Sequence, residues 1–241
     1  MLFICAPQLT GSEIEITEKL TEHIPENINL INENGDTVDL LKELTVPSII
    51  NFVYFNCPGI CSPLLTEIQN TIEVSDLKIG EEYQFITISF DPSETTDLAV
   101  SKKTNYINGM QKRIEAVKGW KFFTGDSLNL AKATNSLGFN YKKVGNEFIH
   151  KACMIVVNQE GKIIRYNMGL KILPQELKIS VIEAAKGNPL PRTYKQNEYC
   201  FPFVAPAYQR LNTLAKQIGI VVVILASVFF LYLVLKPKIS K

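Results

Sequence analysis

Two cysteines, Cys57 and Cys61, are separated by three residues in the stretch Asn51–Pro63, "NFVYFNCPGICSP". They follow an apolar and aromatic run typical of a buried strand, and the spacing of apolar residues after them predicts a helix. If the helix begins close to Cys57, the thiols stand one turn apart near its N-terminus, where free N–H groups and the helix dipole favour the thiolate. Such a pair can form a redox disulfide, bind a soft metal, or be two inert core residues.

A metal bound by two sulfurs needs a further ligand, and the chain has only two histidines, His23 and His150. His23 lies in a polar segment, whereas His150 opens a predicted strand in "GNEFIHKACMIVV". Because a strand antiparallel to its neighbours starts where they end, His150 is expected at the same sheet edge as Cys57. Two thiolates and one imidazole suit Cu(I), and Cu(II) with an added ligand. A structural hydrogen bond is the alternative role of this histidine.

The elements that must position these residues alternate between strand and helix. Apolar runs predict strands at Ser48–Phe55, Tyr83–Phe90, Trp120–Phe123 and Ala152–Val157, with 162–168 as a hairpin partner of the last. Apolar stripes and caps predict helices at Pro63–Glu73, 127–137 and Pro174–Lys186, with polar helix and loop from Ser93 to about Met110. The early alternation implies parallel pairing, and the late hairpin adds an antiparallel strand. The sequence therefore predicts an α/β, thioredoxin-like fold with a mixed central sheet.

The C-terminal part of the chain contains an apolar run, Ile218–Leu235, with no charge, no proline and one glycine. At 1.5 Å rise per residue such a run crosses most of a ~30 Å hydrocarbon core, so we expect a transmembrane helix at 217–236. Three lysines follow it in the tail "KPKISK", against Arg210 and Lys216 before it. The positive-inside rule then places the tail, 237–241, in the cytoplasm and the main domain on the periplasmic or extracytoplasmic side.

The other segments complete the expected organisation. The short apolar start "MLFICAP" suggests a remnant of a signal peptide at 1–9. An N-terminal arm at 10–36, a thioredoxin-like domain at 37–187 and a juxtamembrane linker at 188–216, rich in Pro, Tyr and Phe, come before the span. The net charge is only +1, which gives no support for nucleic-acid binding. The charged residues of Ser93–Lys118 are expected to form a solvated face, and Asp91-Pro92 a strand-ending turn.

Several ordered blocks of the sequence resemble the Sco/SenC family: "NFVYFNCPGICSPLL", "FITISFDPSE", "FTGD" and "FIHKACMIVVNQEGKIIRY". The resemblance covers roughly Val38 to Lys186. It implies a thioredoxin-like, membrane-tethered protein that binds copper and helps to metallate the dinuclear copper centre of cytochrome c oxidase subunit II, or another copper acceptor. It also implies that Cys57, Cys61 and His150 are the copper ligands.

The chain departs from the family pattern at three places near these ligands. The family often has an acidic residue where this chain has Gly59, proline where it has Ser62, and aspartate where it has Ile149. The family's tether is also typically N-terminal. These departures concern the surroundings of the ligands and the architecture of the tether, and leave the three implied ligands in place.

Two functions of different classes follow. The first is a membrane-tethered copper-binding assembly factor that delivers copper or maintains the thiols of its acceptor. The alternative is a thiol–disulfide oxidoreductase, in which Cys57 attacks a partner's disulfide and Cys61 resolves the mixed disulfide, without any need for His150. A peroxidase on the same fold has no separate signature in the sequence. Cys153 is expected in the core, because strand alternation turns it away from the face of His150.

Overall fold

The computed structural model describes residues 14–145 and 147–191 of the 241-residue chain. These residues belong to one compact unit. The expected signal-peptide remnant, transmembrane helix and tail, and the linker beyond residue 191, lie outside the described residues. Across 14–145 and 147–191, no helix has both the length and the apolar composition that crossing a membrane requires.

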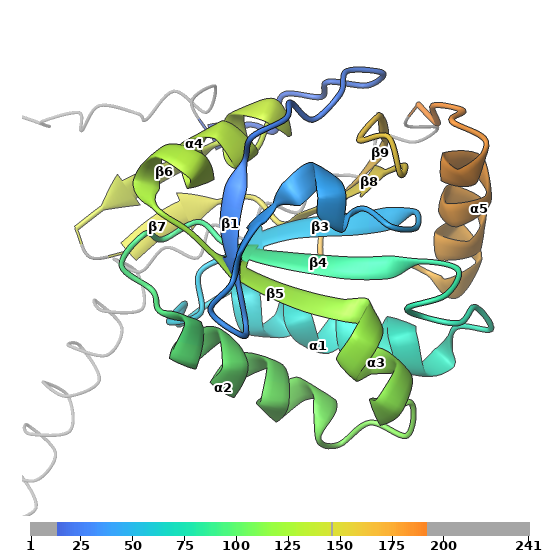
Figure 1. Ribbon diagram of the computed structural model, residues 1–241, viewed down its shortest axis with the longest axis horizontal. Coiled ribbons are helices and arrows are strands. Elements are labelled where there is room, and N and C mark those ends of the chain that lie inside the picture. The colour runs from blue at the N-terminus through green and yellow to red at the C-terminus, as the bar shows by residue number, and fades with distance from the viewer. Residues whose placement is uncertain (1–13, 146, 192–241) are drawn as a thin grey trace, which may run out of the picture. The chain divides into compact units, whose positions relative to one another are not determined.

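In this part of the chain, seven strands form one sheet in the order β2-β1-β5-β4-β3-β8-β9 (Figure 1). Their bounds are β1 (Asn29–Asn32), β2 (Thr37–Asp39), β3 (Ser48–Val53), β4 (Gln84–Ser89), β5 (Trp120–Thr124), β8 (Cys153–Val157) and β9 (Ile163–Met168). β3, β4 and β5 are parallel, whereas β1 and β8 run antiparallel to β5 and β3. The predicted α/β fold with a mixed central sheet is confirmed.

The central strands are buried along their whole length. Every residue of β3, β4 and β8 is buried, which explains why their sequences show no alternation of apolar and polar residues. β8 pairs with β3 so that Asn51 is opposite Met154. The start of β8 therefore lies at the carboxyl end of β3, as the sequence argument about the sheet edge requires.

Five α-helices and the 3-10 turn η2 accompany the sheet in the described residues. They are η2 (Leu40–Glu43), α1 (Cys61–Val74), α2 (Thr96–Ile107), α3 (Arg113–Gly119), α4 (Ser127–Ser136) and α5 (Pro174–Ala185). α1 and α2 lie side by side along the sheet (Figure 1). α1 buries Leu64, Leu65, Ile68 and Ile72, the predicted apolar stripe. Asp126 caps α4 by accepting hydrogen bonds from the N–H groups of Leu128 and Asn129.

A separate two-stranded hairpin, β6 (Tyr141–Val144) and β7 (Glu147–His150), was not predicted. It changes the expected position of His150, which ends β7 instead of opening β8. Two residues then connect β7 to β8. β8 begins at Cys153, which is also the first residue of β8 that pairs with β9. The hairpin was missed because its residues are mostly polar or half-exposed and do not show a buried-strand pattern.

Two polar segments contribute more to the fold than their composition indicates. The segment expected as an arm contains β1, whose Leu30 is fully buried beside β5. The segment Ser93–Lys118, expected as a solvated face, contains two buried charged residues, Glu94 and Lys103, each 8% exposed. Lys103 forms an ion pair with Glu33 and donates a hydrogen bond to the carbonyl of Val117. A buried charge requires such partners, and a single sequence does not reveal them.

Candidate metal centre

Cys57 lies in the turn between β3 and α1, not in the helix. The supposition that a helix begins close to Cys57 does not hold, because α1 begins at Cys61, two residues before the predicted start at Pro63. The turn is held by a hydrogen bond from the N–H of Cys57 to the carbonyl of Tyr54 (3.2 Å). The N–H of Gly59 donates to the sulfur of Cys57 at 3.4 Å. Backbone donors therefore stabilise a negative charge on this partly buried sulfur.

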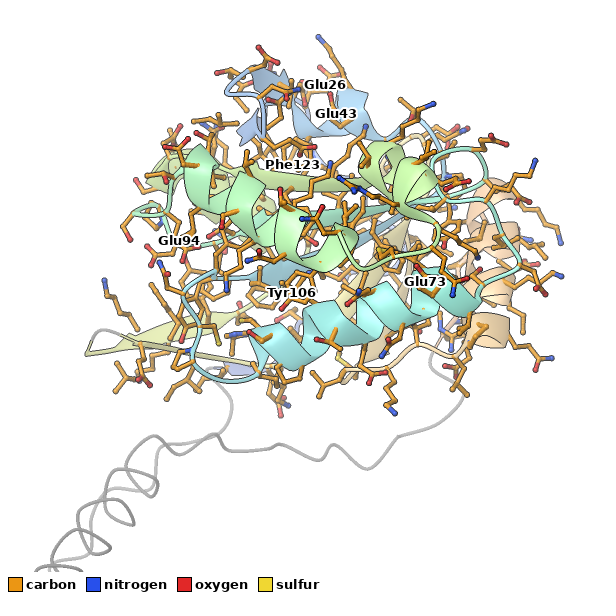
Figure 2. The ribbon with its side chains drawn as sticks, turned by 90° about the horizontal axis from the view of Figure 1, so that it is seen from below. Glu26, Glu43, Glu73, Glu94, Tyr106 and Phe123 are labelled. Carbon is orange, nitrogen blue, oxygen red and sulfur yellow. The ribbon has the colours of Figure 1, made fainter. Side chains whose placement is uncertain are left out.

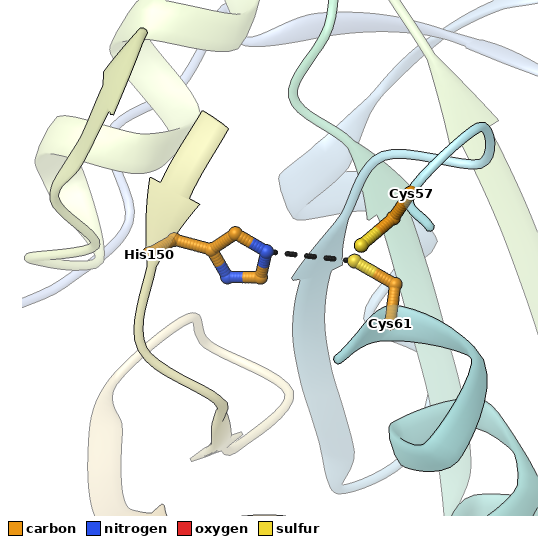
Figure 3. A group of neighbouring side chains, drawn as sticks. All are labelled: Cys57, Cys61 and His150. Carbon is orange, nitrogen blue, oxygen red and sulfur yellow. Dashed lines mark hydrogen bonds between the residues drawn. The ribbon is translucent and has the colours of Figure 1, made fainter. Parts of the chain in front are cut away.

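Cys61 is the first residue of α1 and is buried, only 2% exposed. Pro63 fits the first turn, because the N–H groups there have no partner within the helix. The two thiols are not joined in a disulfide, and their sulfurs lie side by side (Figure 3). The short turn thus brings together the two thiols that one helical turn was expected to align.

His150, at the end of β7, points toward the two sulfurs (Figure 3). Its Nε2 lies 3.5 Å from Sγ of Cys61, and its Nδ1 lies 3.2 Å from the carbonyl oxygen of Lys151. A carbonyl only accepts hydrogen bonds, so Nδ1 carries the proton and donates. In the neutral imidazole, Nε2 then has its lone pair facing the thiols, which is the form of histidine that binds metals.

The three side chains form one cluster of metal-binding atoms. The sulfurs of Cys57 and Cys61 and a ring nitrogen of His150 all lie within 4.8 Å of one another. These are the three residues predicted from the sequence, and the structure brings them together. Thiolate and imidazole donors are soft and suit Cu(I) or Zn²⁺ better than hard cations. The same two thiols are also placed for reversible disulfide formation.

The two thiols differ in acidity. The hydrogen bond with the side chain of Cys61 lowers the pKa of Cys57 well below its usual range, against the opposing effect of burial. The side chain of His150 and the N–H groups of Cys61 and Gly59 lower this pKa further. Burial raises the pKa of Cys61, and the charge of neighbouring Cys57 raises it further. The proton of the pair therefore stays on the buried Cys61, and Cys57 is the thiolate.

Aromatic rings surround the imidazole of His150. Its ring centroid lies 5.1 Å from that of Phe90, 5.7 Å from Phe139 and 6.1 Å from Tyr54. These three residues come from separate segments and are all buried. They fix the orientation of the imidazole and lower the local dielectric constant. These three residues were not predicted as part of the site, although Tyr54 lies only three residues before Cys57.

Two other residues weighed in the sequence have structural roles. Asp91 accepts hydrogen bonds from the N–H and the hydroxyl of Ser93, at 3.0 and 2.7 Å, which is the expected strand-ending turn. Cys153 is buried at the start of β8, only 1% exposed, as expected of a core residue.

Comparison with known proteins places this geometry in a family. The family model described as SCO1/SenC matches residues 16–184. The structure is similar to that of Bradyrhizobium japonicum ScoI with copper bound, with 25% identity, a TM-score of 0.50, and coverage of 65% of this chain and 96% of that one. It is also similar to a candidate electron-transfer protein from Aquifex aeolicus VF5, with 24% identity, a TM-score of 0.62, and coverage of 70% and 95%.

A third solved structure, of BsSco, is reported with a disulfide switch and as a member of the Sco family of cytochrome c oxidase assembly proteins. It has 21% identity and a TM-score of 0.53 over 71% of this chain and 98% of that one. No curated protein sequence matches the chain. The family match spans more than half of the sequence and includes both cysteines and His150. The chain therefore belongs to the SCO1/SenC family.

Proposed function

We propose that this chain is a membrane-anchored protein that binds copper through Cys57, Cys61 and His150. It delivers copper to, or maintains the thiols of, the dinuclear copper site of cytochrome c oxidase subunit II or another copper acceptor. The observation that carries the proposal is the convergence of two sulfurs and one imidazole within 4.8 Å. The proposal is supported by the copper-bound structure of the Bradyrhizobium ScoI and by the description of the BsSco family as oxidase assembly proteins.

The donor set suits a copper ion that must be held and then passed on. Thiolates bind Cu(I) strongly, and two thiolates with one neutral nitrogen leave the ion accessible to a further ligand. Cys57 is only partly buried, so an acceptor's sulfur can approach this side of the site. Each incoming sulfur can then replace an outgoing one without release of a bare ion.

The anchor and its orientation complete the proposal. A helix at 217–236 would keep the domain beside its acceptor and raise their effective concentration. The domain would then lie on the periplasmic or extracytoplasmic side. Truncation after residue 216 tests the anchor: the full chain should stay in the membrane pellet after an alkaline carbonate wash, and the truncated chain should not. Equal recovery of both chains in the soluble fraction would contradict this part of the proposal.

Cu(I) titration of the purified full chain tests the site itself. We expect one equivalent to bind in competition with a chromophoric chelator, and binding to weaken strongly in Cys57→Ser, Cys61→Ser and His150→Ala. His23→Ala and Cys153→Ala are matched controls, because they remove a histidine and a cysteine outside the cluster. Binding that survives in all three site variants would contradict the proposal.

A thiol–disulfide oxidoreductase is the second candidate function. It is favoured by the asymmetry of the pair, in which the partly exposed Cys57 is the thiolate and the buried Cys61 is positioned to resolve a mixed disulfide. The disulfide switch reported for BsSco supports it as well. This function needs both cysteines and does not need the imidazole. The two functions are therefore separated by His150→Ala.

A further inference from the structure

Glu94 lies in the turn between β4 and α2, and its side chain is buried. Its Oε2 accepts hydrogen bonds from the N–H of Phe55 and the hydroxyl of Ser89, both at 2.6 Å, and its Oε1 accepts one from the N–H of Asn56 at 2.8 Å. No lysine or arginine in the described ranges forms an ion pair with it. This buried carboxylate is thus compensated by hydrogen-bond donors.

Two of those donors belong to the backbone directly before Cys57. Phe55 and Asn56 follow the end of β3 and precede α1, so their N–H groups have no partner in a sheet or helix. Phe55 is buried, so its N–H would be costly to leave without an acceptor. The two oxygens of Glu94 supply one acceptor to this N–H and one to the N–H of Asn56, which is more exposed. The carboxylate therefore fixes two consecutive peptide groups, and Cys57 is the next residue along the chain.

We propose that Glu94 is a positioning residue for the metal centre. By bridging the N–H groups of Phe55 and Asn56, it holds the turn so that Sγ of Cys57 stays within reach of Cys61 and His150. This inference rests on the proposed copper function. Figure 2 shows Glu94 on the same side of the view as the β6–β7 hairpin, whose last residue is His150. Glu94 itself is not a ligand. Its charge contributes to the raised pKa of Cys61, but the proposed positioning acts through the backbone.

The carboxylate of Glu94 has two acceptor oxygens and is long enough to reach two N–H groups, and neither glutamine nor aspartate combines these two properties. A glutamine at this position would keep the size but offer one acceptor oxygen and an NH₂ group that faces an N–H donor. An aspartate would keep the charge but is one methylene shorter, so it could not reach both N–H groups from the same backbone. Glu94→Gln and Glu94→Asp therefore separate charge from reach. Ser89→Ala is the matched control, because it removes one hydrogen bond to the same carboxylate and leaves both backbone bonds. It also removes the hydroxyl that accepts a hydrogen bond from the N–H of Asp91 at 3.3 Å.

The test is Cu(I) affinity of the full chain, measured by competition with a chromophoric chelator, with thermal unfolding measured for each variant. We expect Glu94→Gln and Glu94→Asp each to weaken binding by about tenfold or more, the range typical of residues that orient ligands. Ser89→Ala should stay within about threefold of the unsubstituted chain, because the turn remains bridged. Full affinity in Glu94→Asp would mean that charge alone matters, and would overturn the inference. Equal losses in Ser89→Ala and Glu94→Gln would mean that affinity follows general stability, and would overturn it too.

A second readout needs no metal. The midpoint potential of the Cys57–Cys61 pair depends on how the two sulfurs are placed, so it should shift in both Glu94 variants and stay unchanged in Ser89→Ala. If the unsubstituted chain fails to bind Cu(I), the proposed copper function is wrong, and the potential still decides the role of Glu94. Glu94→Gln also removes a charge that acts on Cys61, so Glu94→Asp, which keeps the charge, is the deciding variant. An unchanged potential in Glu94→Asp would overturn the positioning role, whatever the chain binds.

Discussion

Replacing His150 with alanine removes the one nitrogen donor of the cluster and leaves both thiols in place. The imidazole contributes Nε2, 3.5 Å from Sγ of Cys61, with its other nitrogen fixed by the carbonyl of Lys151. Loss of residues that merely orient a metal ligand typically weakens binding 10- to 100-fold, so loss of the ligand itself should cost at least about 100-fold. At about 1.4 kcal/mol for each factor of ten, this is about 2.8 kcal/mol or more of binding free energy.

The assay combines Cu(I) competition with a disulfide-exchange rate measured on the same preparation of the full chain. Exchange with a small disulfide depends on the thiolate of Cys57, and at pH 8 it should stay within about tenfold. The variant loses the contribution of His150 to the lowered pKa of Cys57, but it keeps the larger contribution of the Cys61 side chain and those of the backbone N–H groups. His23→Ala controls for loss of a histidine elsewhere, since His23 is exposed. A loss of affinity below about threefold in His150→Ala, with exchange intact, would refute the reasoning and favour a simple dithiol function.

Two further predictions test the acidity of the pair and the packing of the domain. Because the pKa of Cys57 is lowered, its thiolate persists at pH 6, and the rate of its alkylation by iodoacetamide should be close to the rate at pH 8. The alkylation rate of an ordinary thiol falls about 100-fold over the same range. Cys57→Ser should abolish the labelling at pH 6, and a fall of about 100-fold in the rate for the unsubstituted chain would contradict the lowered pKa. Gly138→Ala should destabilise the domain by at least about 2 kcal/mol in urea unfolding, because Gly138 has φ +63° and an added Cβ would lie 1.8 Å from the carbonyl oxygen of Thr17. Gly35→Ala shares the positive φ but meets nothing within 4 Å, so it should cost only about 1 kcal/mol, and equal costs at both positions would contradict the steric argument.

The central strands and most helices could be predicted from the sequence because burial dictates their composition. The run before Cys57 has no polar alternation since all of β3 is buried, and the stripe after Cys61 matches the face that α1 buries. The predicted strand at Trp120–Phe123 lies within β5, Trp120–Thr124. In each case the local pattern of apolar and polar side chains indicates which faces of the strand or helix are buried.

The parts that escaped prediction depend on contacts between distant segments. The β6–β7 hairpin is half-exposed, and its importance comes from the residue at its end, His150. The burial of Glu94 depends on backbone donors 38 and 39 residues earlier in the chain, which no local pattern records. The exact start of α1 escaped as well, because the turn at Cys57 is stabilised from outside the helix. The ligand types could therefore be named from the sequence, but the groups that hold them in place could not.

X-ray absorption of the Cu(I)-loaded full chain tests the central claim most directly. The account predicts that copper has two sulfur ligands and one nitrogen ligand, and that the nitrogen signal disappears in His150→Ala. A copper ion surrounded by sulfur alone, or by nitrogen and oxygen alone, in the unsubstituted chain would contradict it.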